Sequence, residues 1–374
     1  MKIEIDYISN FSLTDSSGGW NGINYKLVDA LSAKTRLNYI GPINPKIIIH
    51  EKIFSKLLRI LGLPGDYFFF SRKRLENIVK EINSKKLSGK FTFYFGATPW
   101  INHKISTPYG LYIDICFPKY LKLYINDQRF KLKDIDRISE AEKFFLQNAS
   151  IIFWGSNWAK IEAEECYKCS FPQSVVVSTG GHIPIPKQIK IHSNSQLRLL
   201  FISLNFFKKG GHIAFETFKL LKDKGYNVML DIIGEKPPDH ILNVIGVNYH
   251  GVLKKSSKID LKKMQDLLDS SFLLIHPTKM DTMGAVIAEA GYYGLPTVAP
   301  NSFGIPDLII NNKTGLLVDE LTPVEFSNRI EELILSPCAY SEMRRSVRNF
   351  MVTERSWNSI SDIIVKNIQC QLIE

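Results

Sequence analysis

The sequence predicts an α/β protein with two domains, each built on a parallel sheet covered by helices. Its 374 residues are more than one ordinary hydrophobic core organises. Beyond residue 198, short apolar strand patterns alternate with amphipathic helix patterns, which is typical of parallel sheets. A proline-rich and then polar stretch at 183–197 precedes this alternation, so we expect the linker between the two domains there.

The N-terminal half starts with the pattern strand, loop, helix. Residues 1–7 alternate apolar and charged side chains like a half-buried strand, and 23–31 have helical spacing. Between them, Gly18 and Gly19 suit a close approach of the backbone to a phosphate or sugar, although a plain turn accounts for them equally well. Further strands are expected at 37–40, 91–95 and 151–154, whereas 41–72 give no clear pattern.

The C-terminal half continues the alternation. Strands are expected at 199–202, 228–233, 272–276 and 297–299, and helices at 213–221, 261–268 and 284–293. Apolar residues at helical spacing predict a last helix beginning near Trp357. Ligands of such sheets bind at the carboxyl ends of the strands, so the loops after the C-terminal strands are where we expect a site.

The charge balance favours anionic partners, because the formal net charge is +10 and the isoelectric point is about 9.1. The lysines are scattered and no RNA-binding signature is present, which disfavours nucleic acid. Contact of a basic face with an anionic inner membrane leaflet stays open. The sequence has no apolar stretch of spanning length and no apolar signal-peptide core at its start, so we expect a cytoplasmic protein.

The sequence predicts neither a metal site nor a disulfide framework. The cysteine count is odd, and the pair Cys166 and Cys169 has no second pair at zinc-ligand spacing, so we interpret both as thiols at a helix end. The acids at 134–136 resemble the D-x-D site that binds a metal-bound diphosphate. Ser139 and Glu142 follow at the spacing of a capping box, which favours acids at the start of a helix instead.

The segment 276–290 carries the most informative pattern. A buried strand ends, a polar loop with Asp281 follows, and Gly284 opens an apolar helix whose first N–H groups suit an anion. Glu289 lies inside this apolar helix, where a carboxylate needs a partner, and the hydroxyls of a ribose are one. A loop cap and a surface glutamate fit the same spacing, and the residues alone leave both interpretations open.

A second pattern is the pair Lys208 and Lys209, which follows a predicted strand and precedes two glycines and a helix. Two ammonium groups beside backbone N–H groups neutralise a diphosphate and stabilise it as a leaving group. Adjacent lysines in loops are otherwise simply solvated charge.

These patterns together resemble glycosyltransferase family 4. Two acids eight positions apart around a glycine, followed by 290–299, look like its E-x7-E region, and 304–309 with 313–318 resemble its next donor-site stretch. The resemblance is good over 198–360 and loose before it. It implies two Rossmann-like domains (GT-B) at 1–190 and 191–355, with a C-terminal helix at 356–374 that crosses back to the first domain.

The resemblance also implies an activity. The protein would move a sugar, with retention at the anomeric carbon, from a nucleotide-diphosphate sugar to a hydroxyl of a saccharide or lipid-linked saccharide acceptor. It would need no obligatory metal and no other cofactor, and many of its relatives build bacterial surface polysaccharides. It would be a hexosyltransferase-type enzyme of the cytoplasm, in possible contact with the inner face of the membrane.

In the C-terminal half, the resemblance assigns roles residue by residue. Glu289 would hold the ribose, and Asp281, where the family usually has Glu, would face the transferred sugar as a catalytic residue. Lys209 matches the family's lysine, and Lys208 stands in for its arginine, both binding the donor diphosphate. Met283 and Gly284 would complete the donor loop.

In the N-terminal half, Gly18 and Gly19 match the position of the family's glycine-rich loop, and Asp114 matches a strand-to-helix turn at the cleft, where it would be catalytic. The histidine that the family places near the reaction centre has no clear match in His103 or His182.

Three alternatives remain. A GT-B enzyme of this kind could cleave, epimerise or phosphorolyse its substrate, or the protein could bind sugar nucleotides without catalysis. A dinucleotide oxidoreductase is disfavoured, because no G-x-G-x-x-G follows a strand.

Overall fold

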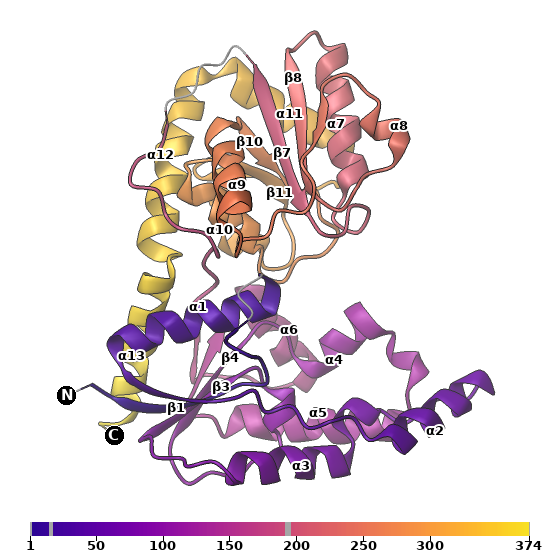
Figure 1. The fold of residues 1–374 in the computed structure, drawn as a ribbon, viewed down its shortest axis with the longest axis vertical. Coiled ribbons are helices and arrows are strands. Elements are labelled where there is room, and N and C mark those ends of the chain that lie inside the picture. The colour runs from indigo at the N-terminus through magenta and orange to yellow at the C-terminus, as the bar shows by residue number, and fades with distance from the viewer. Residues whose placement is uncertain (1, 15–17, 191–195, 374) are drawn as a thin grey trace. The chain divides into compact units, whose positions relative to one another are not determined.

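The computed structural model describes residues 2–14, 18–190 and 196–373. They form two compact units. The first comprises the described residues of 1–15, 24–177 and 361–374, and the second those of 16–23 and 178–360. Each unit is an α/β structure with its own parallel sheet (Figure 1).

The sheet of the first unit has the strand order β2-β1-β3-β4-β5-β6, and every pairing in it is parallel. Its strands are β1 (Glu4–Ile8), β2 (Arg36–Ile40), β3 (Phe91–Phe95), β4 (Tyr109–Ile113), β5 (Ile151–Trp154) and β6 (Ser174–Val176). Every residue of β3 is buried, as expected for a central parallel strand with helices on both faces. On one face, Tyr7, Phe93 and Phe153 form a row of stacked rings.

The helices of the first unit connect these strands. They are α1 (Gly19–Lys34), α2 (Ile49–Ile60), α3 (Arg72–Asn83), α4 (Phe117–Tyr120), α5 (Leu132–Gln147) and α6 (Asn157–Tyr167), with short turns η1 (Phe68–Phe70), η2 (Thr98–Trp100), η3 (Leu121–Ile125) and η4 (Asp127–Arg129). Helix α1 begins in the second unit and continues into the first. The carboxylate of Asp362, in the last helix, pairs with Lys34 of α1 at 2.6 Å.

The sheet of the second unit has the order β12-β11-β10-β7-β8-β9, again parallel throughout. Its strands are β7 (Leu197–Ser203), β8 (Val228–Gly234), β9 (Val247–Tyr249), β10 (Leu273–Ile275), β11 (Thr297–Pro300) and β12 (Gly315–Val318). Side chains of β7 alternate between two cores, with Leu199 and Phe201 in one and Leu200 in the other. Both faces of this sheet are therefore buried.

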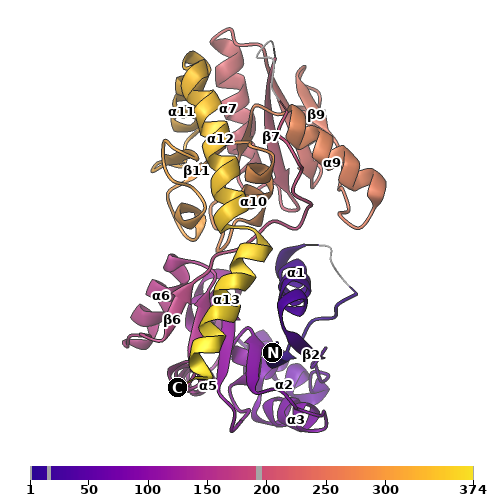
Figure 2. The same ribbon diagram turned by 90° about the vertical axis from the view of Figure 1, so that its left-hand side faces the viewer.

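The helices of the second unit are α7 (Gly211–Asp223), α8 (Asp239–Leu242), α9 (Lys258–Ser270), α10 (Ala285–Tyr292), α11 (Pro323–Leu335), α12 (Pro337–Glu354) and the start of α13 (Trp357–Gln371), with the turn η5 (Ile305–Asp307). Helices α7 and α11 pack on one face of the sheet, and α9 and α10 contribute to the core on the other. Helix α12 runs beside α10 (Figure 2). Among the described residues, no helix is both long and apolar enough to cross a bilayer.

The predicted strands and helices of both halves are confirmed, with ends that shift by a few residues. The longer segment of the second unit begins at Ser178, against a predicted boundary after 190, because the backbone at 180–181 packs on Glu289, Tyr292 and Trp357. From Ser361 onward, α13 belongs to the first unit.

One local prediction needs correction. The capping box at Ser139 and Glu142 is wrong, because α5 already begins at Leu132 and the Ser139 hydroxyl donates to the carbonyl of Ile135 inside the helix. Glu142 is instead fully buried and accepts hydrogen bonds from the Phe117 amide and the Tyr167 hydroxyl. The acids at 134–136 do lie at the start of a helix, as expected. The segment 41–72, which gave no pattern, contains α2 and η1.

Candidate functional site

An ion pair joins the two loops that the sequence singled out. β7 and β10 are neighbouring parallel strands, so the loops that follow them start at the same edge of the sheet. The ammonium of Lys209, in the loop before α7, donates to the Asp281 carboxylate at 2.8 Å and to the Met280 carbonyl at 2.9 Å. An ammonium has three donors, so within the described residues one proton of Lys209 remains for a ligand.

Asp281 organises its own loop. Its Oδ1 accepts hydrogen bonds from the amides of Gly284 at 2.8 Å and Met283 at 3.3 Å, while Oδ2 lies 3.1 Å from Nε2 of His276. Burial raises the pKa of this carboxyl, but the hydrogen bond from His276 and the charge of Lys209 outweigh burial and hold the pKa well below its usual range. Asp281 is thus an ionised cap at the start of α10, which also fixes the Lys209 ammonium.

Gly210 permits the close approach of these two loops. It precedes α7 in a left-handed conformation, with φ of 75°. A Cβ built on it would lie 1.9 Å from the carbonyl oxygen of Pro277, which no side chain tolerates. The glycine before α7 is therefore required by the contact with the β10 loop as well as by its backbone angle.

We predict that Gly210→Ala destabilises the second unit by on the order of 3 kcal/mol, because it adds backbone strain and forces the Pro277 loop away. Chemical denaturation monitored by circular dichroism measures this loss. Gly225→Ala is the matched control: Gly225 also has positive φ, but a Cβ there meets nothing within 4 Å. We expect the control to lose only about 1 kcal/mol. Equal losses in both variants would contradict the role of the Pro277 contact.

Glu289 lies on α10 and is completely buried, so the alternative of a surface glutamate is wrong. Its Oε1 accepts hydrogen bonds from the backbone amide of His182 at 2.9 Å and from the Lys255 ammonium. Burial raises the pKa of Glu289, but the charge of Lys255 and then that of His182 lower it below its usual value. Within the described residues, Oε2 is buried and has no hydrogen-bond partner.

Lys255 was not among the predicted site residues. It lies in the loop between β9 and α9, and its side chain is only 14% exposed. The adjacent lysines at 254–255 were a signal of the same kind as those at 208–209. Their partner on α10 is 34 positions away in the chain, however, and sequence spacing does not reveal such a contact.

Two glycines bring the backbone up to Glu289. A Cβ on Gly181 would lie 2.7 Å from Cγ of Glu289, and one on Gly180 would lie 2.8 Å from Nε1 of the Trp357 indole. The Tyr292 hydroxyl accepts a hydrogen bond from the Gly181 amide at 2.9 Å. This packing directs the amide of His182 at the carboxylate.

Two of the N-terminal glycines lie close to the His182 side chain. A Cβ on Gly22 would lie 3.1 Å from the His182 imidazole, and one on Gly18 would lie 3.7 Å from its Nδ1. Gly19 is exposed, and a Cβ on it would meet nothing within 4 Å. Gly18 therefore lies close to His182, whose backbone amide donates to Glu289, whereas Gly19 does not.

Lys208 does not join either ion pair. Its side chain is exposed, and in the described part of the chain its ammonium makes no hydrogen bond or ion pair. Within the described residues, the two acids pair with two different lysines, Asp281 with Lys209 and Glu289 with Lys255.

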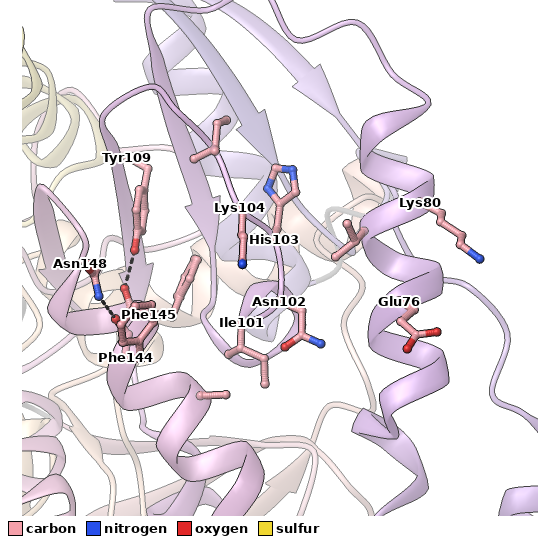
Figure 3. A pocket seen from close by; sticks show the side chains of 13 residues that line it. Glu76, Lys80, Ile101, Asn102, His103, Lys104, Tyr109, Phe144, Phe145 and Asn148 are labelled. Atoms are coloured by element: carbon pink, nitrogen blue, oxygen red, sulfur yellow. Dashed lines mark hydrogen bonds between the residues drawn. The ribbon is translucent and has the colours of Figure 1, made fainter.

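In the first unit, Asp114 directly follows β4, at the carboxyl end of that strand. His103 lies toward the other end, in the connection that leads into the first residue of β4, Tyr109. Its Nδ1 is 2.6 Å from the Tyr94 hydroxyl and burial lowers its pKa. His103 lines a pocket of about 830 Å³ between α3 and the end of α5 (Figure 3). The two candidates of this unit therefore do not share a site.

Comparisons with known proteins show similarities in sequence and in fold. Residues 185–350 match the family model described as Glycosyl transferases group 1. The capsular polysaccharide biosynthesis glycosyltransferase CapM of Staphylococcus aureus is 24% identical over 162 residues, which make up 41% of this chain and 42% of CapM. The chain spans less than half the length of the curated relatives that it matches.

Solved structures resemble the chain over its whole length. The sucrose-phosphate synthase of Thermosynechococcus elongatus has a TM-score of 0.68 at 14% identity and covers 99% of both chains. HepE of Anabaena, in complex with UDP-glucose, has a TM-score of 0.65 at 13% identity, covering 98% of this chain and 100% of HepE. At such identities the likeness is one of fold. The chain thus has the two parallel-sheet Rossmann-like domains of the GT-B fold, and its residues 185–350 match the family model for glycosyl transferases group 1.

Proposed function

We propose that the protein transfers a hexose-type sugar from a nucleotide-diphosphate sugar to an acceptor hydroxyl, with retention at the anomeric carbon. The observation that carries this proposal is the ion pair of Lys209 and Asp281 at the carboxyl edge of β7 and β10. It fixes a cation that still has a free donor where ligands of parallel α/β sheets bind. HepE, which shares the fold, was solved with UDP-glucose.

The residues would divide the work as follows. Lys209 would donate to the diphosphate as it leaves, with Lys208 adding charge from the same loop and no obligatory metal needed. The free Oε2 of Glu289 would accept a hydrogen bond from a ribose hydroxyl. Asp281 would hold Lys209 in position and face the transferred sugar. Asp114, directly after β4, would be a catalytic residue that acts on the acceptor.

The acceptor would be a saccharide or a lipid-linked saccharide, and the product a bacterial surface polysaccharide or glycoconjugate made at the cytoplasmic face of the membrane. The likeness to CapM, a capsular polysaccharide enzyme by name, supports this setting.

Thermal-shift measurements with a panel of nucleotide sugars test the donor. A ligand that binds the folded state at about 100 times its dissociation constant stabilises it by about 2.7 kcal/mol. We expect one donor to raise Tm, its nucleoside diphosphate to raise Tm less, and NAD to have no effect. A panel in which no nucleotide sugar changes Tm would count against the proposal.

Product analysis with the donor that binds then separates the alternatives. Release of free sugar or conversion of the donor without any acceptor indicates cleavage or epimerisation. Binding without turnover on any acceptor indicates a silent binder. A product with the donor's anomeric configuration supports retaining transfer.

A further inference from the structure

Helix α2 of the first unit has an inverted distribution of polar and apolar side chains. Five large apolar residues of the helix and Leu61 directly after it are each more than half exposed: Ile49, Ile53, Phe54, Leu57, Ile60 and Leu61. With successive residues about 100° apart, they lie within an arc of about 140°. The residue buried against the unit is instead the small and polar Ser55. A stripe of this kind normally faces a core, and here it faces outward.

The chain fixes α2 in this orientation through small and polar contacts. The Ser55 hydroxyl donates to the Asp66 carbonyl at 2.8 Å. Gly65 packs on Ser55 so closely that a Cβ there would lie 2.3 Å from Oγ. The Gly65 amide donates to the carbonyl of Arg129 at 3.0 Å, which ties the loop after α2 to the body of the unit. The outward stripe is thus a fixed feature of the fold, and α2 lies at the periphery of its unit (Figure 1).

Cations border the stripe on both sides. Lys52 and Lys56 are exposed next to Ile49 and Ile60 on the helical wheel. Beyond Phe54, at the opposite edge, the Lys131 ammonium lies 5.8 Å from the centre of the Phe54 ring and also pairs with the Asp66 carboxylate at 2.7 Å. An apolar stripe flanked by lysines is complementary to a bilayer surface, where acyl chains accept the apolar side chains and anionic head groups accept the cations.

We propose that α2 is a membrane-docking helix that lies in the interface of an anionic lipid bilayer. A second copy of the chain fits this face less well, because lysines border both edges of the stripe, so face-to-face packing would place lysines of the two copies beside one another. This proposal rests on one part of the proposed function, the contact with the membrane, and names α2 as the surface that makes it. It does not depend on the chemistry of the donor site.

Co-sedimentation with vesicles tests the proposal without any nucleotide or acceptor, so its outcome is separate from that of sugar transfer. We expect the protein to bind vesicles of equal parts phosphatidylglycerol and phosphatidylcholine, and to bind pure phosphatidylcholine about ten-fold or more weakly. The triple variant Ile53→Gln/Leu57→Gln/Ile60→Gln should lose binding to anionic vesicles by about ten-fold or more. Lys52→Glu/Lys56→Glu should lose about as much on anionic vesicles and little on neutral ones.

Two matched controls are available. Ile245→Gln/Ile259→Gln/Leu335→Gln removes three exposed apolar side chains of the second unit, and Lys85→Glu/Lys86→Glu reverses two exposed cations elsewhere in the first. Both should bind vesicles like the unaltered protein, and all variants should keep its Tm because every altered side chain is exposed. Equal binding by the α2 variants and their controls overturns the proposal. A second outcome also overturns it. The unaltered protein does not bind vesicles, and sedimentation velocity shows a concentration-dependent dimer that the triple α2 variant no longer forms.

Discussion

Replacing Lys209 with alanine is expected to lower kcat for sugar transfer by about 10²–10³-fold, the range found when one preorganised donor to a developing negative charge is removed. The ammonium is held by the Asp281 carboxylate and the Met280 carbonyl before any ligand arrives. Because the Lys209 ammonium does not have to reorganise during the reaction, the alanine substitution removes all of its stabilisation of the departing diphosphate. KM for the donor should rise less than kcat falls, since charge on the leaving group grows toward the transition state.

The control for this variant is Lys279→Ala, which removes an exposed cation from the loop that carries Asp281. It changes the net charge equally and should leave kcat within about three-fold, because exposed charges are screened. Lys208→Ala should fall between the two, since its ammonium is exposed and unpaired within the described residues. Steady-state kinetics with the identified donor measures all three. If Lys209→Ala turns over as fast as Lys279→Ala, the leaving-group role is wrong.

The sequence predicted the sheets well because buried parallel strands leave a strong pattern. Five successive apolar or small residues between polar breaks, as in β3, are too few for a buried helix and fit a central strand. Helix α2 escaped prediction for the opposite reason. Ile47, Ile48 and Ile49 form a β-branched run that suits a strand, and the apolar stripe of the helix does not face a core. A prediction that assumes that apolar side chains are buried fails for a helix whose apolar side chains are exposed.

One part of the candidate site, the meeting of Lys209 and Asp281, could be predicted from the order of the strands. Lys209 and Asp281 each follow a strand of one parallel sheet, and neighbouring strands end at the same edge, so their meeting follows from the strand order. The partner of Glu289 does not follow from any such rule. Lys255 lies in an irregular loop, and the His182 amide is a backbone group of a kind that nearly every residue possesses. Sequence patterns identify charged side chains but do not show which buried carboxylate a loop will reach.

Changing Glu289 to glutamine is expected to raise the donor's KM by about 30–100-fold, with a smaller change in kcat. A ribose hydroxyl that donates to a carboxylate forms a charge-assisted hydrogen bond, worth about twice a neutral one, and the substitution removes this charge. It also leaves the Lys255 ammonium beside a neutral amide. Breaking a buried ion pair from one side costs about 3–5 kcal/mol, and we expect the low end because Lys255 keeps some contact with solvent. Tm should therefore fall together with donor affinity.

The double variant Glu289→Gln/Lys255→Met separates these two effects. Methionine removes the unpaired ammonium, so the double variant should recover most of the stability that Glu289→Gln loses. Donor affinity should not recover, because the carboxylate that accepts the ribose hydroxyl is still missing. Thermal unfolding and donor KM, measured on the same preparations, distinguish the outcomes. A double variant whose KM recovers along with its Tm would mean that Glu289 only supports the fold. A single variant with unchanged KM would remove Glu289 from the donor site altogether.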